Sequence, residues 1–382
     1  MDTLIPVLIF ILILGVVIFI HELGHFLAAR RAGIFVEEFA LGMGPILLSY
    51  QGRRKGEGTE EDEEGTLYSL RAFPIGGFCR MRGMDDEAND DPGAMNNKPI
   101  PARLLVMAGG SIMNFLLAFV LFFMLVMLQG YNVLEVVSVN EGFPAYNAGL
   151  RAGDRITHIN GTRVDMQEDM AVVINAARGR DIAVRVNRDG VRYDFSVTPD
   201  YVDGRYLIGI TRRGARQQGF LSDRPTDGDF RRIRVGEGLV NAGEMIVFHI
   251  RAPFRLIAQL IAGDPLPEGG AVMGPIGIGA VVTEVYQISM EQERGILDMV
   301  LTMVFIAAFI NAALGIMNLL PIPALDGARI IFLLIEAVRK KPVPPEKEAM
   351  VHMVGFVILI VLAIFIAYQD IARLLNLGDY AG

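Results

Sequence analysis

The sequence predicts a polytopic α-helical membrane protein with four transmembrane helices, a membrane-associated β-hairpin loop and one β-rich module outside the membrane. Of the 382 residues, 52% are hydrophobic, and the mean hydropathy is +0.40. The apolar residues gather in four long runs that are almost free of charge. Residues 131–210 differ, because short apolar runs alternate there with turn residues. This composition excludes an ordinary soluble enzyme.

The four apolar runs are Leu4–Ile20, Leu104–Leu128, Met299–Leu325 and Val351–Tyr368. Each is close to the roughly 20 residues that a helix needs to cross the hydrocarbon core. The first run could also be a signal peptide, but the acidic Asp2 precedes it and the basic pair Arg30 and Arg31 follows it. We therefore expect a helix that is retained.

The basic residues predict the orientation of the four helices. Lysines and arginines are frequent between the first two runs and between the last two, and they are absent just after the second run. By the positive-inside rule, both termini and the long middle segment lie outside the cytoplasm. The acidic tract at residues 57–65 is expected to be a solvated loop.

The segment at residues 65–83, "GTLYSLRAFPIGGFCRMRG", alternates like a hairpin with Pro74, Gly76 and Gly77 at its bend. Alone, the pattern is typical of an ordinary cytoplasmic hairpin. Irregular backbone at membrane depth must be covered by protein or must line water.

The motif "HELGH" ends the first apolar run and predicts a metal site. His21 and His25 are four residues apart, so both imidazoles lie on one face of a helix and can bind one ion, while Glu22 can act as a general base. The alternative is that the three side chains only pack in a bundle. Ionisable residues inside a span are costly, which favours the metal site.

A third ligand is expected from Asp326, the only acidic residue of a long apolar stretch. It follows two prolines, so it could also cap the next helix, and the two roles are compatible. We expect His249 and His352 to be packing or surface residues. Two imidazoles and a carboxylate suit Zn²⁺ best among divalent ions.

Residues 140–164, "NEGFPAYNAGLRAGDRITHINGTRV", resemble a bacterial PDZ domain. The resemblance is carried by Pro-Ala, Ala-Gly-Leu, Gly-Asp-Arg-Ile and Ile-Asn-Gly, in that order. It implies a groove that binds an extended peptide by strand addition. The alternative is a spacer of similar sequence.

Together, HExxH on a first membrane helix, the PDZ-like module and "NLLPIPALDG" on the third span resemble the bacterial site-2 protease family, in particular its regulator-of-sigma-factor type. The resemblance covers nearly the whole chain. It implies that His21, His25 and Asp326 bind zinc and that Glu22 is the catalytic base. It also implies that Asn318 holds substrate or stabilises the oxyanion.

Two further matches imply substrate contacts. Asn114 occupies the position of the family's asparagine on the second span, although Ser111 replaces the usual proline nearby. The stretch containing Gly76, Gly77 and Phe78 resembles the family's membrane-embedded β-loop. On this basis we expect it to line the site and pair with an unwound substrate.

The implied function is that of an intramembrane zinc metalloprotease in the inner membrane of a bacterial cell, with a single extracytoplasmic PDZ domain and an active site toward the cytoplasm. The implied substrates are single-span membrane proteins already trimmed outside, such as anti-sigma factors and signal peptide remnants. Two alternatives are a non-catalytic PDZ membrane adaptor and a divalent-metal transporter.

The predicted domains are residues 1–130 with two spans and the β-loop, 131–210 as the PDZ domain, 211–295 as an amphipathic connection and 296–382 with the last two spans. The acidic tract accounts for part of the net charge of −8. No basic patch indicates a nucleic-acid partner. The single cysteine, Cys79, excludes an internal disulfide framework.

Overall fold

The computed structural model describes residues 4–55, 62–84, 91–129, 131–164, 167–202, 204–217, 234–262, 273–291 and 296–379. Residues 57–61 of the acidic tract lie outside this part. The chain divides into two compact units, which are described separately: Met1–Phe122 with Ala242–Gly382, and Phe123–Asn241.

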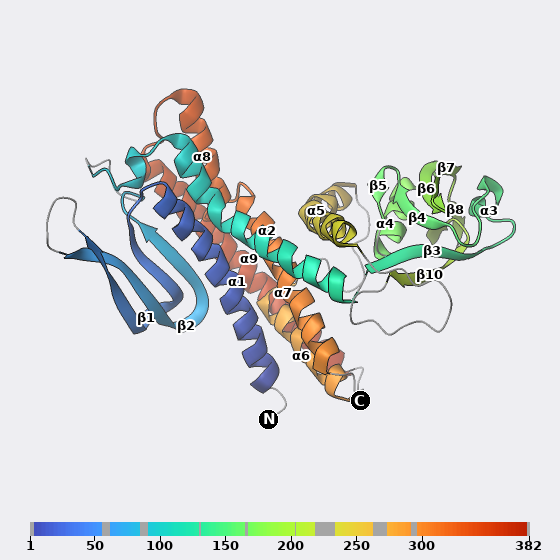
Figure 1. Ribbon diagram of the computed structural model, residues 1–382, viewed down its shortest axis with the longest axis horizontal. Helices are drawn as coiled ribbons and strands as arrows, with labels where there is room; N and C mark the ends of the chain where they lie inside the picture. Colours follow the sequence, from blue (N-terminus) through green and yellow to red (C-terminus); the bar gives the residue numbers. More distant parts are fainter. Residues whose placement is uncertain are drawn as a thin grey trace. The chain divides into compact units, whose positions relative to one another are not determined.

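Within the described residues, four helices are long and apolar enough to cross a membrane, as the sequence predicts. They are α1 (Leu4–Arg31), α2 (Ile100–Gln129), α7 (Ile296–Leu319) and α9 (Pro345–Asp379) (Figure 1). Gly33 ends α1 in a left-handed conformation, with φ of 67°. The basic pair of the last turn faces the negative end of the helix dipole.

Three further helices contribute to the first unit. The predicted amphipathic stretch forms α5 (Val235–Ala262), and α8 (Asp326–Arg339) follows the third span. The sequence did not single out α6 (Pro275–Glu291), which packs against α1, α7 and α9. Buried Asp370 of α9 accepts the backbone N–H groups of two glycines at the start of α6, at 3.0 and 2.8 Å. This carboxylate joins the two helices.

The β-loop forms β1 (Val36–Lys55) and β2 (Asp62–Met81), which lie beside α1 (Figure 1). Residues 65–83 do not form the hairpin that the sequence predicts. Instead, residues 38–41 of β1 pair both with residues 67–70 and with residues 77–80, so the two halves of the segment pair with β1. Alternation predicts strands but not their partners, which explains the difference.

The second unit is built on an antiparallel sheet whose strand order is β10-β3-β4-β6-β7, with β5 paired to β4. Two helices and the small β8–β9 sheet accompany it. Their bounds are β3 (Tyr131–Val139), α3 (Pro144–Ala148), β4 (Arg155–Ile159), β5 (Thr162–Arg163), α4 (Gln167–Ala177), β6 (Ile182–Arg188), β7 (Val191–Val197), β8 (Asp200–Val202), β9 (Arg205–Leu207) and β10 (Ile210–Gln217).

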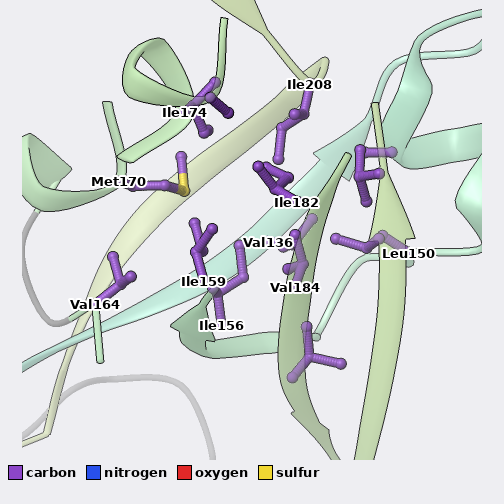
Figure 2. Packing of buried hydrophobic residues seen from close by; sticks show 14 residues of the cluster. Val136, Leu150, Ile156, Ile159, Val164, Met170, Ile174, Ile182, Val184 and Ile208 are labelled. Carbon is purple, nitrogen blue, oxygen red and sulfur yellow. The ribbon is translucent and has the colours of Figure 1, made fainter. Parts of the chain in front are cut away.

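A buried apolar cluster forms the core of this unit, with side chains from α4 and the main strands pointing toward one another (Figure 2). Outside it, the carboxylate of Asp154 is fully buried and receives hydrogen bonds from Arg188 at 2.6 and 2.8 Å. The backbone N–H of Arg151 also donates to it, at 2.9 Å. The aspartate of the Gly-Asp-Arg-Ile motif therefore fixes the turn before β4.

Candidate metal centre

The structure brings His21, His25 and Asp326 together, although more than 300 positions separate the histidines from the aspartate in the chain. The two Nε2 atoms are 3.2 Å apart, and Asp326 Oδ2 lies 3.3 Å from His21 Nε2 and 3.2 Å from His25 Nε2. Both imidazoles are buried, at 9% and 5% exposed. Among the described residues, these three are the group that could hold a metal ion.

The triangle of donor atoms fits a zinc ion. In a tetrahedral site with zinc–ligand distances of about 2.0–2.1 Å, neighbouring ligand atoms lie about 3.3 to 3.4 Å apart. The three observed separations are 3.2, 3.2 and 3.3 Å. Three protein ligands of this kind leave a fourth position open, as in catalytic zinc sites.

Hydrogen bonds orient both imidazoles. His25 Nδ1 lies 2.8 Å from the carbonyl oxygen of Val106, so Nδ1–H donates and Nε2 keeps its lone pair for a metal. His21 Nδ1 lies 3.2 Å from the side-chain amide of Asn114. Asn114 Oδ1 is buried without a partner, and a half-turn of the amide group brings this acceptor to Nδ1–H. Asn114 therefore contacts a proposed ligand, although the sequence predicted a substrate contact.

Three glycines let α1 and α2 approach closely enough to place the histidines. A Cβ at Gly24 would collide with the backbone of Gly109, and a Cβ at Gly109 would lie 2.7 Å from the carbonyl oxygen of Gly24. A Cβ at Gly110 would lie 2.5 Å from ring atoms of both His21 and His25. Sequence reasoning missed these glycines, although the small residues of "AGGS" in a transmembrane helix are a signal of close packing.

The segment after α7 delivers Asp326. The two prolines of "LLPIPALDG" cannot continue the hydrogen-bonded ladder of α7, so the helix ends at Leu319. Asp326 is the first residue of α8, while Leu325 occupies the N-cap position without a side-chain cap bond. Asp326 therefore does not cap the helix by a side-chain bond to its backbone, and its carboxylate is available to the histidines.

Asn318 lies in the last turn of α7, and its amide nitrogen is 3.4 Å from His21 Nε2. Its side chain is thus at the edge of the donor triangle, and it is only 9% exposed. This position is compatible with a contact to substrate beside the metal.

Glu22 contacts the strand β2, which packs against α1. The backbone N–H of Cys79 donates a hydrogen bond to the Glu22 carboxylate. A Cβ at Gly77 would lie 3.1 Å from Glu22 Cγ and 2.9 Å from the carbonyl oxygen of Ala40, so only glycine fits there. Of the three β-loop residues predicted to contact substrate, Gly77 is thus next to the predicted base.

The other two β-loop residues lie around this contact. Gly76 has a φ of 81°, which few residues except glycine adopt. The Phe78 ring lies beneath two guanidinium groups, with Arg71 at 5.0 Å and Arg80 at 5.8 Å from its centroid. These arginines and Ser69 donate to Glu38, which is 2% exposed.

The remaining histidines are elsewhere. His249 packs as predicted: its ring is stacked on Phe122 with centroids 5.3 Å apart, and Phe309 contacts it edge-on. His352 is not merely a surface residue, since Nδ1 accepts the backbone N–H of Ala324 at 2.9 Å. Ala324 is two residues before Asp326.

An HExxH motif whose two histidines meet an aspartate among apolar helices is typical of an intramembrane metalloprotease. Residues 9–362 match Peptidase family M50, the site-2 protease family. The chain belongs to this family. It is accordingly a multi-pass membrane protein and a zinc metalloprotease that acts within the membrane.

Full-length relatives agree with this assignment. A protein of Clostridium acetobutylicum, described provisionally as a zinc metalloprotease, is 33% identical over 372 residues, which are 97% of this chain and 98% of the relative. The regulator of sigma-W protease RasP of Bacillus subtilis is 29% identical, covering 96% of this chain and 98% of its own. The zinc metalloprotease RasP of Geobacillus kaustophilus is 29% identical, with 97% and 99% covered.

Among solved structures, the PDZ domain of the SdrC-like protein from Listeria monocytogenes covers 22% of this chain and 88% of its own, at 26% identity. The TM-score is 0.20.

Proposed function

We propose that this chain hydrolyses peptide bonds within membrane-spanning segments at one zinc ion, which His21, His25 and Asp326 hold. The observation that carries the proposal is the triangle of donor atoms, with sides of 3.2, 3.2 and 3.3 Å. When bound, zinc supplies Lewis acidity, which polarises a scissile carbonyl group and lowers the pKa of water.

Glu22 is the general base in this proposal. It lies on α1 between the two histidines, and the Cys79 N–H fixes its carboxylate. The carboxylate takes a proton from the attacking water and passes it to the leaving amine. Asn318, within 3.4 Å of His21 Nε2, donates a hydrogen bond to the developing oxyanion. A donor of this kind contributes about 3 kcal/mol to transition-state binding.

The substrate is held as an extended strand. Helical segments keep their carbonyl groups in internal hydrogen bonds, so a membrane helix must unwind before hydrolysis. Strand β2 passes the predicted base at Gly77, and a strand added there would present its backbone to Glu22. Gly76, Gly77 and Phe78 are the proposed contacts in the β-loop.

We propose single-span membrane proteins as substrates, with anti-sigma factors and signal peptide remnants as the two classes. The relative in Bacillus subtilis is named a regulator of sigma-W protease, which supports the first class. The proposed location is the bacterial inner membrane, with the active site toward the cytoplasm. The distribution of basic residues supports this orientation.

We also propose that residues 131–210 form an extracytoplasmic PDZ domain that admits only trimmed substrates. The motifs of residues 140–164 and the antiparallel sheet built around them support this assignment. A large folded outer domain on a substrate would be held away from the membrane site.

Replacing Glu22 with Gln tests the proposed mechanism. The amide has almost the same shape but cannot accept the proton, so the purified variant should keep about one zinc ion per chain while cleavage falls at least about 100-fold. Cleavage of a single-span substrate in detergent or liposomes is the readout. Unchanged cleavage would remove Glu22 from the mechanism, and metal flux through the variant in liposomes would favour a transporter.

A further inference from the structure

The segment that carries Asp326 contains a strained residue. Ala324 has a φ of 76°, which residues other than glycine rarely adopt. Such a strained conformation persists only where contacts with the surrounding structure stabilise it. Within residues 320–325, backbone hydrogen bonds run from Ile322 N–H to Leu320 O at 2.7 Å and from Leu325 N–H to Ile322 O at 3.1 Å.

Helix α9 provides the outside support. The Ala324 N–H points at His352 Nδ1, 2.9 Å away. One turn further along α9, Gly355 lies against Pro323, where a Cβ would collide with the proline ring and lie 2.9 Å from its carbonyl oxygen. The same face of α9 therefore contacts two consecutive residues of the strained segment.

We propose that His352 is a positioning residue for Asp326: by accepting the Ala324 N–H, it holds the segment in the conformation that points the Asp326 carboxylate at the two histidines. This proposal rests on the proposed metal site. Since Nδ1 must be the acceptor, the imidazole hydrogen is on Nε2, which faces Glu348 Oε1 at 3.7 Å. The acceptor at the Nδ1 position is what matters, not the ring as such.

The surroundings of His352 allow this to be tested without disturbing a packed core. The residue lines a cavity of about 830 Å³ together with residues of α2, α8 and α9. Its side chain is 17% exposed. Smaller or differently shaped side chains therefore have room at this position.

The test compares three variants that differ in where they place an acceptor. In His352→Asn, Oδ1 occupies nearly the position of Nδ1. In His352→Gln, the acceptor lies near the position of Nε2, and His352→Leu has none. We expect zinc affinity, measured by chelator competition, to fall about tenfold in the Gln and Leu variants and to stay near the original value in the Asn variant.

Hydrogen exchange of the Ala324 amide in the zinc-free protein gives a readout that does not depend on metal or activity. Protection of the Ala324 amide from exchange should persist in the unmodified protein and in His352→Asn. It should be lost in His352→Gln and His352→Leu. His249→Asn, at a histidine that packs elsewhere, is the matched control and should leave both measurements unchanged.

Ala324→Gly provides a second test, because glycine adopts the left-handed conformation without strain. Combined with His352→Leu, it should recover part of the lost zinc affinity. Equal zinc affinity and exchange in the Asn, Gln and Leu variants would overturn the proposal. Failure of the proposed function is distinguishable, since it would appear as retained cleavage in Glu22→Gln while the exchange result stands.

Discussion

Glycines matter as much to the metal site as the side chains that bind the ion. Gly110 has its Cα against both imidazoles, so the space that a methyl group would occupy is already filled by ring atoms. The rings cannot move away freely, because Nδ1 of His25 is bonded to the carbonyl group of Val106 on the same helix as Gly110. The position of the two histidines is therefore set jointly by α1 and α2.

Gly110→Ala should displace the rings by part of an ångström or more and weaken the site. Misplacement on that scale can reduce a reaction rate by about 100-fold. We expect a loss of cleavage of that order together with a lower zinc content, measured on the same purified sample. Gly15→Ala is the control, since nothing lies within 4 Å of a Cβ at Gly15 and activity should persist. Full activity in Gly110→Ala would contradict the account of the α1–α2 contact.

The ligands were predictable from the sequence, and their supports were not. His21 and His25 are recognisable because their spacing is local to one helix, and Asp326 because it is a lone acid in an apolar stretch. The contact of Gly110 with the rings and that of His352 with Ala324 join distant segments. Packing between helices decides such contacts. The small residues of "AGGS" indicate that another helix lies close, but they do not indicate which side chains it places there.

Among the elements, the β-loop depends on one buried carboxylate. Burial by itself would raise the pKa of Glu38, but hydrogen bonds from Ser69, Arg71 and Arg80 outweigh it and hold that pKa below its usual value. The two arginines also cover Phe78. Glu38 therefore holds β1 to the part of β2 that reaches Glu22.

Replacing Glu38 with Gln leaves the two arginines without their counter-charge. Loss of one partner of a buried ion pair costs about 3–5 kcal/mol of folding stability. Because Arg80 is exposed to solvent, we expect Glu38→Gln to lower the stability by about 2 kcal/mol. Limited proteolysis of the β-loop should become faster, and the substrate KM should rise more than kcat falls. Glu37→Gln, at a more exposed carboxylate with a 3.4 Å contact to Arg82, should change little. Equal effects of the two variants would refute the special role of Glu38.

The β-loop should also loosen at low pH. Because the pKa of Glu38 is lower in the folded protein than in the unfolded chain, its contribution to stability is complete above the unfolded pKa of about 4.3 and is lost as pH falls through the folded value. Proteolysis or hydrogen exchange of β1 and β2 between pH 7 and pH 3 should show this loss. In Glu38→Gln, the part of the pH-dependent loosening that comes from the Glu38 carboxylate should be missing. An identical pH profile in the two proteins would contradict the stabilising role of this carboxylate.

The sequence predicted strands in the β-loop but not their arrangement. Alternation of "GTLYSLRAF" indicates a strand with two different faces, and the Pro-Gly-rich part indicates a bend. The pairing of residues 38–41 with both halves of residues 65–83 depends on β1, whose own pattern is less regular. Register is set by contacts across strands, so the sequence of one strand does not fix it.

For the whole molecule, one compact unit holds three of the four apolar helices and most of α2, and the other holds the antiparallel sheet of β10-β3-β4-β6-β7. The four spans were predictable since the length and hydropathy of a run are local properties. Helix α6 was not, because its 17 residues are too short and too mixed to indicate a span. Its place in the helical bundle is defined by its contacts with α1, α7 and α9, which the sequence does not indicate.

Deletion of residues 131–217, with a flexible linker in their place, tests the proposed gate. If the second unit excludes untrimmed substrates, the shortened protein should cleave an untrimmed single-span substrate that the full chain leaves intact. Cleavage of a trimmed substrate should continue, which also shows that the membrane unit folds. A shortened protein that cuts only the trimmed substrate would show that exclusion has another cause.

The central claim is that one zinc ion joins segments more than 300 residues apart. Its direct test is the zinc content of the purified protein with and without Asp326. We predict about one zinc ion per chain for Glu22→Gln, and a zinc content near zero after dialysis once Asp326→Ala is added to it. Equal zinc retention in both proteins would contradict the claim, because Asp326 would then not be a ligand.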